Sequence, residues 1–281
     1  MSDFVQQQNS ICDFNSSDSW VILSPIEQNI KRKIEAVGTP LKDWDIQINY
    51  GIKTGFNDAF IISTEKRNEI LFNCKTEDER QRTAELIRPI LRGRDIKRYG
   101  YVENGLYLIN THNGIRGKIP RIRIEDYPSI KAHLDQYWDK IEKRADQGDT
   151  PYNLRNCAYL EDFYKPKIVY SEIVREPQFY LDNNGQFFPE ATVFIMTGKG
   201  IEALYHAFHT DIITYIFKHF YAGGGLGEEG YRYKKAFFEK LPIPKECVSD
   251  DFNETTAEQK LINMFGLSAE EKDFILQDKR K

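Results

Sequence analysis

The 281-residue sequence predicts an α+β fold, and three observations support this. Apolar residues recur at helical spacing in residues 24–38 and 128–144. Short runs rich in β-branched and aromatic residues are typical of strands and lie at 167–174, 178–181 and 192–196. After residue 245 the composition becomes acidic and polar, with two short helical patterns at 256–265 and 268–277. The length suits one large domain with a sizeable core, followed by a small helical appendage.

The N-terminal residues 1–19 are polar and acidic, which predicts a tail or linker and not a secretory signal. The motif Ser24-Pro-Ile-Glu27 then combines a capping serine, a proline in the first turn and a glutamate three residues after the cap, so it predicts a helix start. Its apolar stripe is Ile26, Ile30, Ile34 and Val37. Gly38 and Pro40 end this helix.

A glycine loop follows, between predicted strands at 45–50 and 59–63. Its two glycines, Gly51 and Gly55, allow a backbone turn that bulkier residues resist. Lys53, Thr54 and Asn57 offer a cation, a hydroxyl and an amide, which suit phosphates and base edges. The alternative is a hairpin-like turn whose polar residues face water.

Charge is unevenly distributed along the chain, whose net value is −4. Residues 80–123 hold eleven basic and three acidic side chains, and a local field, not net charge, decides where a polyanion docks. A helix capped at Thr76 opens this region. The basic side chains after it lie in a turn at 92–99 and a loop at 111–123, and they are Arg92, Arg94, Lys97, Arg98, Arg116, Lys118, Arg121 and Arg123. Alternation with Ile122 and Ile124 puts Arg121 and Arg123 on one side of an extended segment. The alternative is a solvated charged face.

The later part of the chain gives weaker signals. Asp182-Asn-Asn-Gly185 predicts a hairpin turn between strands at 178–181 and 186–188. Helical patterns cover 200–208 and 210–221 and end at the glycine-rich Ala222–Gly227, which lacks the Gly-Lys-Ser/Thr ending of a phosphate-binding loop. We expect Trp44 and Trp138 in the core.

Several chemistries lack a signal. No apolar run approaches the roughly 20 residues of a membrane helix. The four cysteines form no Cys-x-x-Cys pair, which argues against zinc and for a reduced compartment, so we expect a cytoplasmic protein. His206 and His209 are three residues apart but lack a third metal ligand. No Asn/Asp-Pro-Pro-aromatic motif and no glycine fingerprint for a methyl donor is present.

Five motifs, in this order, resemble one family. They are Gly51-Ile-x-Thr-Gly-x-Asn57-x-Ala-Phe60, Ile87-Arg-Pro-Ile-Leu-Arg-Gly-Arg-Asp-Ile96, Pro151-Tyr-Asn-Leu-Arg-Asn-Cys-Ala-Tyr159, Phe163-Tyr-Lys-Pro-Lys-Ile168 and Leu241-Pro-Ile-Pro244. The chain over residues 20–245 resembles the TaqI-like specificity domain. That domain is the DNA target-recognition part of type IIG restriction–modification enzymes and adenine-specific DNA methyltransferases.

This resemblance implies a curled mixed or antiparallel sheet with flanking helices. It implies a target-recognition domain at 20–245, to which the composition adds a tail at 1–19 and a helical appendage at 246–281. Phosphate contacts would come from the basic turn and loop and from Arg232, while base contacts would come from Lys53, Thr54, Asn57, Tyr152 and Arg155. The equally weighted alternative is that Arg155 bonds an internal carboxylate and that Tyr152 packs inside the protein.

The same resemblance places catalysis elsewhere. A methyltransferase domain or subunit would use S-adenosylmethionine, with magnesium where the parent enzyme also cleaves DNA, in the cytoplasm of a bacterium or archaeon. This chain would be a C-terminal fragment or a separate specificity polypeptide. Two alternatives stay open from the residues alone: a hydrolase or transferase with unrecognised catalytic residues, and a protein-interaction module.

Overall fold

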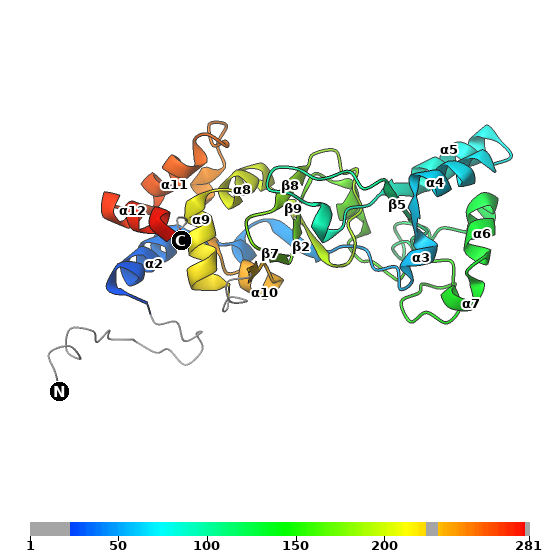
Figure 1. Cartoon of the computed structure of the whole chain (residues 1–281), viewed down its shortest axis with the longest axis horizontal. Coiled ribbons are helices and arrows are strands. Elements are labelled where there is room, and N and C mark those ends of the chain that lie inside the picture. The colour runs from blue at the N-terminus through cyan, green and yellow to red at the C-terminus, as the bar shows by residue number, and fades with distance from the viewer. Residues whose placement is uncertain (1–22, 223–229, 279–281) are drawn as a thin grey trace. The chain divides into compact units, whose positions relative to one another are not determined.

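The computed structural model describes residues 23–222 and 230–278 (Figure 1). They divide into two compact units. The helical unit contains the described residues up to Ile46, Ile173–Pro177, and those from Lys199 onward; the sheet unit contains Gln47–Glu172 and Gln178–Gly198. The expected tail at 1–19 and most of Ala222–Gly227 lie outside the described residues. The domain boundaries at residues 19 and 245 stay a prediction.

In the helical unit, α2 (Pro25–Val37) begins as its sequence predicts. Ser24 Oγ accepts a hydrogen bond from the Glu27 amide, and the Ser24 amide donates 2.7 Å to Glu27 Oε2. The helix buries Ile30 and Ile34 and ends at Gly38. A Cβ at Gly38 would lie 2.7 Å from Cβ of Pro242, so a larger residue would displace the neighbouring strand.

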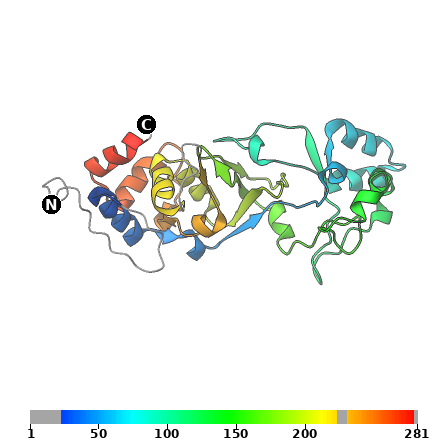
Figure 2. The ribbon, with the colours of Figure 1, turned by 60° about the horizontal axis from the view of Figure 1, so that its bottom comes forward.

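The rest of the helical unit packs around the C-terminal helices. Helix α11 (Ala257–Phe265) contacts α2, α8 (Ile201–Phe208) and α9 (Asp211–Ile216), and α12 (Ala269–Asp278) contacts α9 (Figures 1 and 2). Short helix α10 (Lys235–Phe238) and two antiparallel strand pairs complete the unit. The pairs are β1 (Thr39–Pro40) with β11 (Pro242–Ile243), and β7 (Ile173–Val174) with β10 (Tyr231–Arg232).

The sheet unit contains two sheets. The first has the order β2 (Ile46–Tyr50), β9 (Val193–Gly198), β6 (Lys167–Ser171) and β8 (Phe179–Asp182), and β6 is antiparallel to both β8 and β9. The second has the order β3 (Ile61–Ser63), β5 (Leu106–Ile109) and β4 (Ile87–Pro89), all antiparallel. The predicted α+β class is therefore confirmed, whereas the expected curl of the sheet stays a prediction.

The sheet unit also contains five α-helices, which are interspersed with its strands along the chain. They are α3 (Asn57–Phe60), α4 (Thr64–Phe72), α5 (Glu77–Leu86), α6 (Pro128–Asp135) and α7 (Trp138–Ile141). One apolar cluster joins them to both sheets, and it includes Phe60, Ile109, Ile130, Phe163 and Val169. Because α3 and β5 adjoin the two predicted binding loops, this core fixes one end of each loop.

Three local predictions were wrong because tertiary contacts override local pattern. Residues 186–188 form no strand, since the amides of Gln186 and Phe187 donate to the Asp182 carboxylate and the Phe188 amide donates to the Pro89 carbonyl. Residues Ala59 and Phe60 lie in α3, not in the following strand. The helix expected at 128–144 is interrupted between α6 and α7.

The interruption has a consequence for one aromatic residue. Trp44 is buried as expected, but Trp138 is 36% exposed and is not a core residue. Its ring instead contacts Tyr152, with centroids 5.3 Å apart. Helix α4 was not predicted from the sequence. It buries only Ile70, and a single buried residue leaves no apolar repeat to detect.

A buried ion pair holds the first sheet. Lys167 is fully buried and donates 2.6 Å to Asp182 Oδ2 and 2.7 Å to the Phe163 carbonyl. Burial lowers the pKa of Lys167, and Asp182 opposes that shift. Removing the carboxylate leaves an uncompensated buried charge, so we expect Asp182→Ala to lower the free energy of unfolding by about 3–5 kcal/mol.

Urea denaturation at neutral pH measures this effect, with Glu69→Ala as the control. Glu69 pairs with Lys66 at 2.5 Å on the surface, where an ion pair contributes about 0.2–1 kcal/mol. Equal losses of stability in the two variants would contradict the role assigned to the buried pair.

Candidate nucleic-acid interface

Arg144 connects the glycine loop to the segment that follows α7. Its side chain is 6% exposed and lies over the ring of Phe60, with Cζ 4.4 Å from the centroid. The guanidinium donates to four carbonyls, those of Thr54, Asp146, Pro151 and Asn153. Burial lowers its pKa to about 10, so the group stays charged at neutral pH. The planar fork thereby fixes the glycine loop against residues 146–153.

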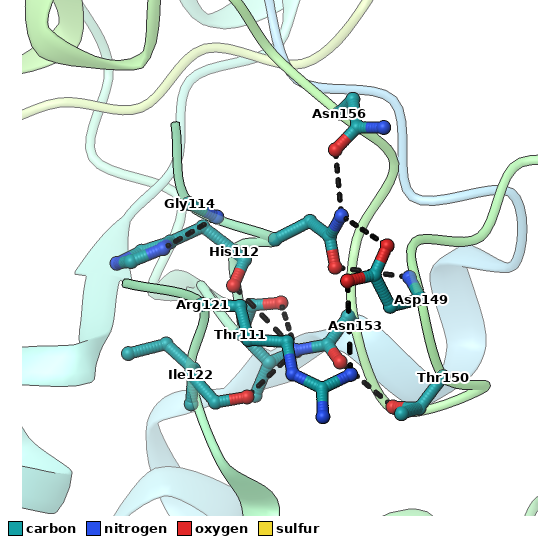
Figure 3. Close-up of polar contacts among 10 residues, drawn as sticks. Thr111, His112, Gly114, Arg121, Ile122, Asp149, Thr150, Asn153 and Asn156 are labelled. Atoms are coloured by element: carbon teal, nitrogen blue, oxygen red, sulfur yellow. Dashed lines mark hydrogen bonds and ion pairs between the residues drawn. The ribbon is translucent and has the colours of Figure 1, made fainter. Parts of the chain in front are cut away.

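Asn153 connects the same segment to the loop at 111–123 (Figure 3). It is 2% exposed, and its Nδ2 donates 2.8 Å to the Ile122 carbonyl while Oδ1 accepts 2.7 Å from Thr150. The Leu154 amide donates 2.9 Å to the Thr111 carbonyl. Three segments distant in sequence therefore meet, and we call residues 51–57, 111–123 and 146–156 the three-loop face.

Two cations of this face share one carboxylate. Lys53 Nζ lies 2.9 Å from one oxygen of Asp146, and Arg155 lies 3.3 Å from the other. The hydrogen bond from Lys53, with a smaller contribution from Arg155, holds the pKa of Asp146 below its usual value. Both cationic side chains are more than half exposed. One positive charge is left over, and such exposed pairs are weak enough for a phosphate to replace the carboxylate.

The loop at 111–123 supplies four further cations. Arg121 lies 3.8 Å from Asp149, and Lys118 pairs with Glu161. Within residues 23–222 and 230–278, no carboxylate lies within 4.0 Å of Arg116 or Arg123. Arg121 and Arg123 are exposed while Ile122 is half-buried and Ile124 is buried, as the alternation predicted.

A polar hollow of about 590 Å³ opens in this loop, between Arg116, Lys118, Arg121, Asp149 and Asn156. Gly114 closes the turn with φ 72°, where a Cβ would lie 2.3 Å from the Ile119 carbonyl oxygen. Only glycine fits this close approach, so the turn that presents the cations depends on it.

Three polar candidates already have partners inside the protein. Thr54 is 2% exposed, and its hydroxyl donates 2.5 Å to Oδ1 of Asn57. Asn57 is exposed, and its Nδ2 donates 2.7 Å to Glu190. The Tyr152 hydroxyl donates 2.5 Å to Asp135. Thr54 therefore orients Asn57 and does not itself face a ligand, whereas Asn57 remains on the surface.

The remaining candidates lie apart from the three-loop face in sequence. Arg92 contacts the buried Asp95 through its amide at 2.8 Å and its Nε at 3.3 Å. Burial alone would raise the pKa of Asp95, but hydrogen bonds from the Arg92 amide and Asn104 lower it. Arg94 is exposed, and Arg98 Nε donates 3.2 Å to the Tyr99 hydroxyl. Arg232 lies in β10 of the helical unit, whereas the other candidates belong to the sheet unit.

Sequence reasoning missed the two residues that assemble the face. Arg144 had one usable signal, since it lies three residues after the buried Ile141 and so on the apolar side of a helical turn. A charged residue at such a position is rarely buried unless it is paired. Asn153 gave no comparable signal, because the acceptors of its Nδ2 are backbone carbonyls 31 to 42 residues away.

Within the described ranges, no group of three His, Cys, Asp or Glu side chains is placed to hold a metal ion. Helices of the described chain are too short or too polar to cross a membrane.

No family model matches the chain. Its fold matches a part of two solved restriction–modification enzymes. One is the type IIL enzyme MmeI in complex with DNA, with a TM-score of 0.51, 12% sequence identity, and 72% of this chain and 25% of that chain covered. The other is the type IIG restriction endonuclease BpuSI, with a TM-score of 0.50, 15% identity, and coverage of 87% and 28%. The chain thus spans about a quarter of the length of either protein. Identity at this level shows the fold, and it agrees with the type IIG resemblance seen in the sequence motifs.

The Arg144 contacts generate a prediction. Removing the fork in Arg144→Met leaves buried carbonyls without donors, and each such loss costs about 1–3 kcal/mol. We expect a lower free energy of unfolding and faster amide hydrogen exchange at Gly148 and Leu154, whose amides are held in this network.

Lys143→Met is the matched control, because Lys143 is exposed and adjacent and carries the same charge. It should leave both measurements unchanged. Equal exchange rates at Leu154 in the two variants would show that Arg144 does not hold the three-loop face together.

Proposed function

We propose that this chain binds double-stranded DNA as the specificity part of a restriction–modification enzyme with adenine methyltransferase or endonuclease activity. The single observation that carries this is the three-loop face, on which Lys53, Arg116, Lys118, Arg121, Arg123 and Arg155 are presented by a fixed backbone. The fold similarity to a part of MmeI, an enzyme solved with DNA, supports the same proposal.

Division of labour follows from the chemistry of the side chains. Arg116, Lys118, Arg121 and Arg123 supply charge on an exposed loop, which suits phosphates and sets the register on a duplex. Lys53, Asn57 and Arg155 come from the segments held by Arg144, so they are the proposed readers of base edges. Thr54 orients Asn57 through its hydrogen bond, whereas the hydroxyl of Tyr152 is bonded to Asp135.

Cations outside this face have a secondary place in the proposal. Arg94 is exposed and without a carboxylate within 4.0 Å in the described ranges, so it extends the phosphate-binding set. Arg92 and Arg98 shape the turn around Arg94 through their contacts with Asp95 and Tyr99. Arg232 is proposed as a phosphate contact contributed by the helical unit.

Carboxylates next to the cations tune the affinity. Asp146, Asp149 and Glu161 each pair with a cation of the face, and Asp149 is 60% exposed. A phosphate can displace such a surface partner at a cost of about 0–1 kcal/mol. The ion pairs therefore weaken non-specific DNA binding, which depends on phosphate contacts alone. They weaken specific binding less, because base contacts add to the phosphate contacts there.

Catalysis is assigned to a partner. In this proposal a methyltransferase domain or subunit outside the chain binds S-adenosylmethionine and, where DNA is cleaved, magnesium, in a bacterial or archaeal cytoplasm. The role of this chain is to position the partner on the recognised sequence, so the chain alone would bind without turnover.

The phosphate contacts generate a salt-dependence prediction for the full chain. We expect duplex affinity to fall steeply with rising salt concentration. Arg121→Ala should reduce the slope of log K against log salt by about one, because the variant neutralises one phosphate fewer and so releases one counterion fewer. Electrophoretic mobility shift at several salt concentrations measures the slope. The matched control is Arg80→Ala, which removes an exposed arginine from α5. A salt-independent titration, or no difference between the two variants, would contradict the proposal.

The base contacts generate a second prediction. Selection from a randomised duplex library should recover one recognised sequence for the unmodified chain. Arg155→Gln should relax preference at one base pair by about 1–3 kcal/mol and leave the other positions unchanged. A uniform loss of affinity at all positions would make Arg155 a phosphate contact and not a reader.

A further inference from the structure

Asn57 lies on the three-loop face with its amide group in a defined orientation. The Thr54 hydroxyl donates 2.5 Å to Asn57 Oδ1, and Asn57 Nδ2 donates 2.7 Å to Oε1 of Glu190. A carboxylate can only accept hydrogen bonds, so the atom beside Glu190 has to be the amide nitrogen. The amide oxygen then faces Thr54, whose hydroxyl has to be the donor. The two partners therefore exclude the flipped orientation of the amide.

Glu190 is held in this place by its backbone. Its amide donates 2.9 Å to the Leu91 carbonyl, and its carbonyl accepts 2.9 Å from the Val193 amide. Beside it, the Ile52 amide of the glycine loop donates 2.7 Å to the Pro189 carbonyl. Glu190 and the glycine loop are thus fixed relative to each other.

Thr54, the other partner of the amide, is fixed as well. The residue is 2% exposed, and its carbonyl accepts a hydrogen bond from the buried Arg144. Both partners of the Asn57 amide are therefore attached to backbone that is ordered before any ligand binds. A side chain held in this way loses little conformational freedom when it binds, so its contacts contribute more to affinity.

The Asn57 amide keeps hydrogen-bonding capacity for a ligand. A side-chain amide has two donor hydrogens and an oxygen that can accept two hydrogen bonds. In the part of the chain that the structure describes, the Asn57 side chain bonds only Thr54 and Glu190. One hydrogen of Nδ2 and one acceptor position of Oδ1 remain, and the residue is exposed. Asn57 therefore presents a donor next to an acceptor.

The charge beside Asn57 favours a base edge over a phosphate as the ligand. Glu190 places a carboxylate next to the amide nitrogen. This negative charge repels the oxygens of a phosphate, and it also disfavours guanine, which presents two acceptors in the major groove. An amino group of a base carries positive partial charge and is favoured at the same place.

Adenine is the base whose major-groove edge matches this arrangement. It presents the N6 amine as a donor and N7 as an acceptor, whereas cytosine presents one amine, and thymine presents one acceptor and a methyl group. We propose that Asn57 reads a base-paired adenine of the recognised sequence and that Glu190 is the positioning residue that fixes its amide. The inference rests on the proposed DNA binding and adds to it the identity of one base and the role of Glu190.

The first arm of the test places base analogues in the duplex recovered by library selection. 7-Deazaadenine lacks the N7 acceptor, and 2-aminopurine pairs with thymine but has no amine at N6. At one adenine of the site, each analogue should weaken binding by the unmodified full chain about five-fold or more, as measured by mobility shift at fixed salt.

Variants then identify the residue that senses the analogues. In Asn57→Ala, both analogues should lose their effect at that one adenine, because the donor and the acceptor are gone. Asn73→Ala is the matched control, since it removes an exposed asparagine at the end of α4, and it should keep the effect of both analogues.

The second arm tests Glu190. Glu190→Ala frees the Asn57 amide, so the preference for adenine at the same base pair should fall about two- to ten-fold. Glu190→Gln should restore most of the preference, because the glutamine oxygen still accepts from Asn57. Glu85→Ala is the control, since Glu85 on α5 also accepts from an amide, at 3.3 Å from Gln81 Nε2. It should leave the preference unchanged, and thermal unfolding checks that each variant folds.

Three outcomes would overturn the inference and leave the proposed function standing. They are a recognised sequence without an A·T pair, analogue effects that persist at every adenine in Asn57→Ala, and a loss of affinity in that variant that is the same for every sequence. Equal losses of preference in Glu190→Ala and Glu190→Gln would overturn the positioning role. Absence of any duplex binding would overturn the proposed function and the inference together.

Discussion

One buried guanidinium sets the arrangement on which the proposed site depends. Arg144 satisfies four backbone carbonyls, including those of Thr54 in the glycine loop and Pro151 in the later segment. Loops of this composition otherwise keep large conformational entropy, and fixing each residue costs about 1–2 kcal/mol. The charge is tolerated in the interior because carbonyl dipoles and the ring of Phe60 surround it. A lysine could not replace this fork, since a single ammonium lacks the planar set of donors.

Electrostatics on the three-loop face differ from those of the chain as a whole. The net charge is −4, yet the exposed cations of 111–123 protrude from a backbone held by Asn153. Their carboxylate partners lie on the surface and are exposed, unlike Asp182, which is locked to Lys167 in the interior. The same type of ion pair therefore stabilises the fold in one place and remains exchangeable for a polyanion in another.

The sequence predicted those features of the fold that depend on residues close together in the chain. The capping motifs at Ser24, Thr76 and Ser268 each begin a helix, because cap and amide are three residues apart. Strand β5 and the alternation of Arg121 with Ile122 followed in the same way. The false hairpin after Asp182 shows the limit, since that carboxylate bonds backbone amides beside a buried lysine. Arg144 and Asn153 donate to backbone carbonyls that have no side-chain signature, so beyond the position of Arg144 on an apolar face the sequence did not indicate their roles.

Hydrogen exchange of the full chain, with and without the recognised duplex, tests the account most directly. If the face held by Arg144 is the binding surface, DNA should slow amide exchange in 51–57, 111–123 and 146–156 together, with little change in α2 and α11. Protection confined to the helical unit, or none in a saturated complex, would contradict the account.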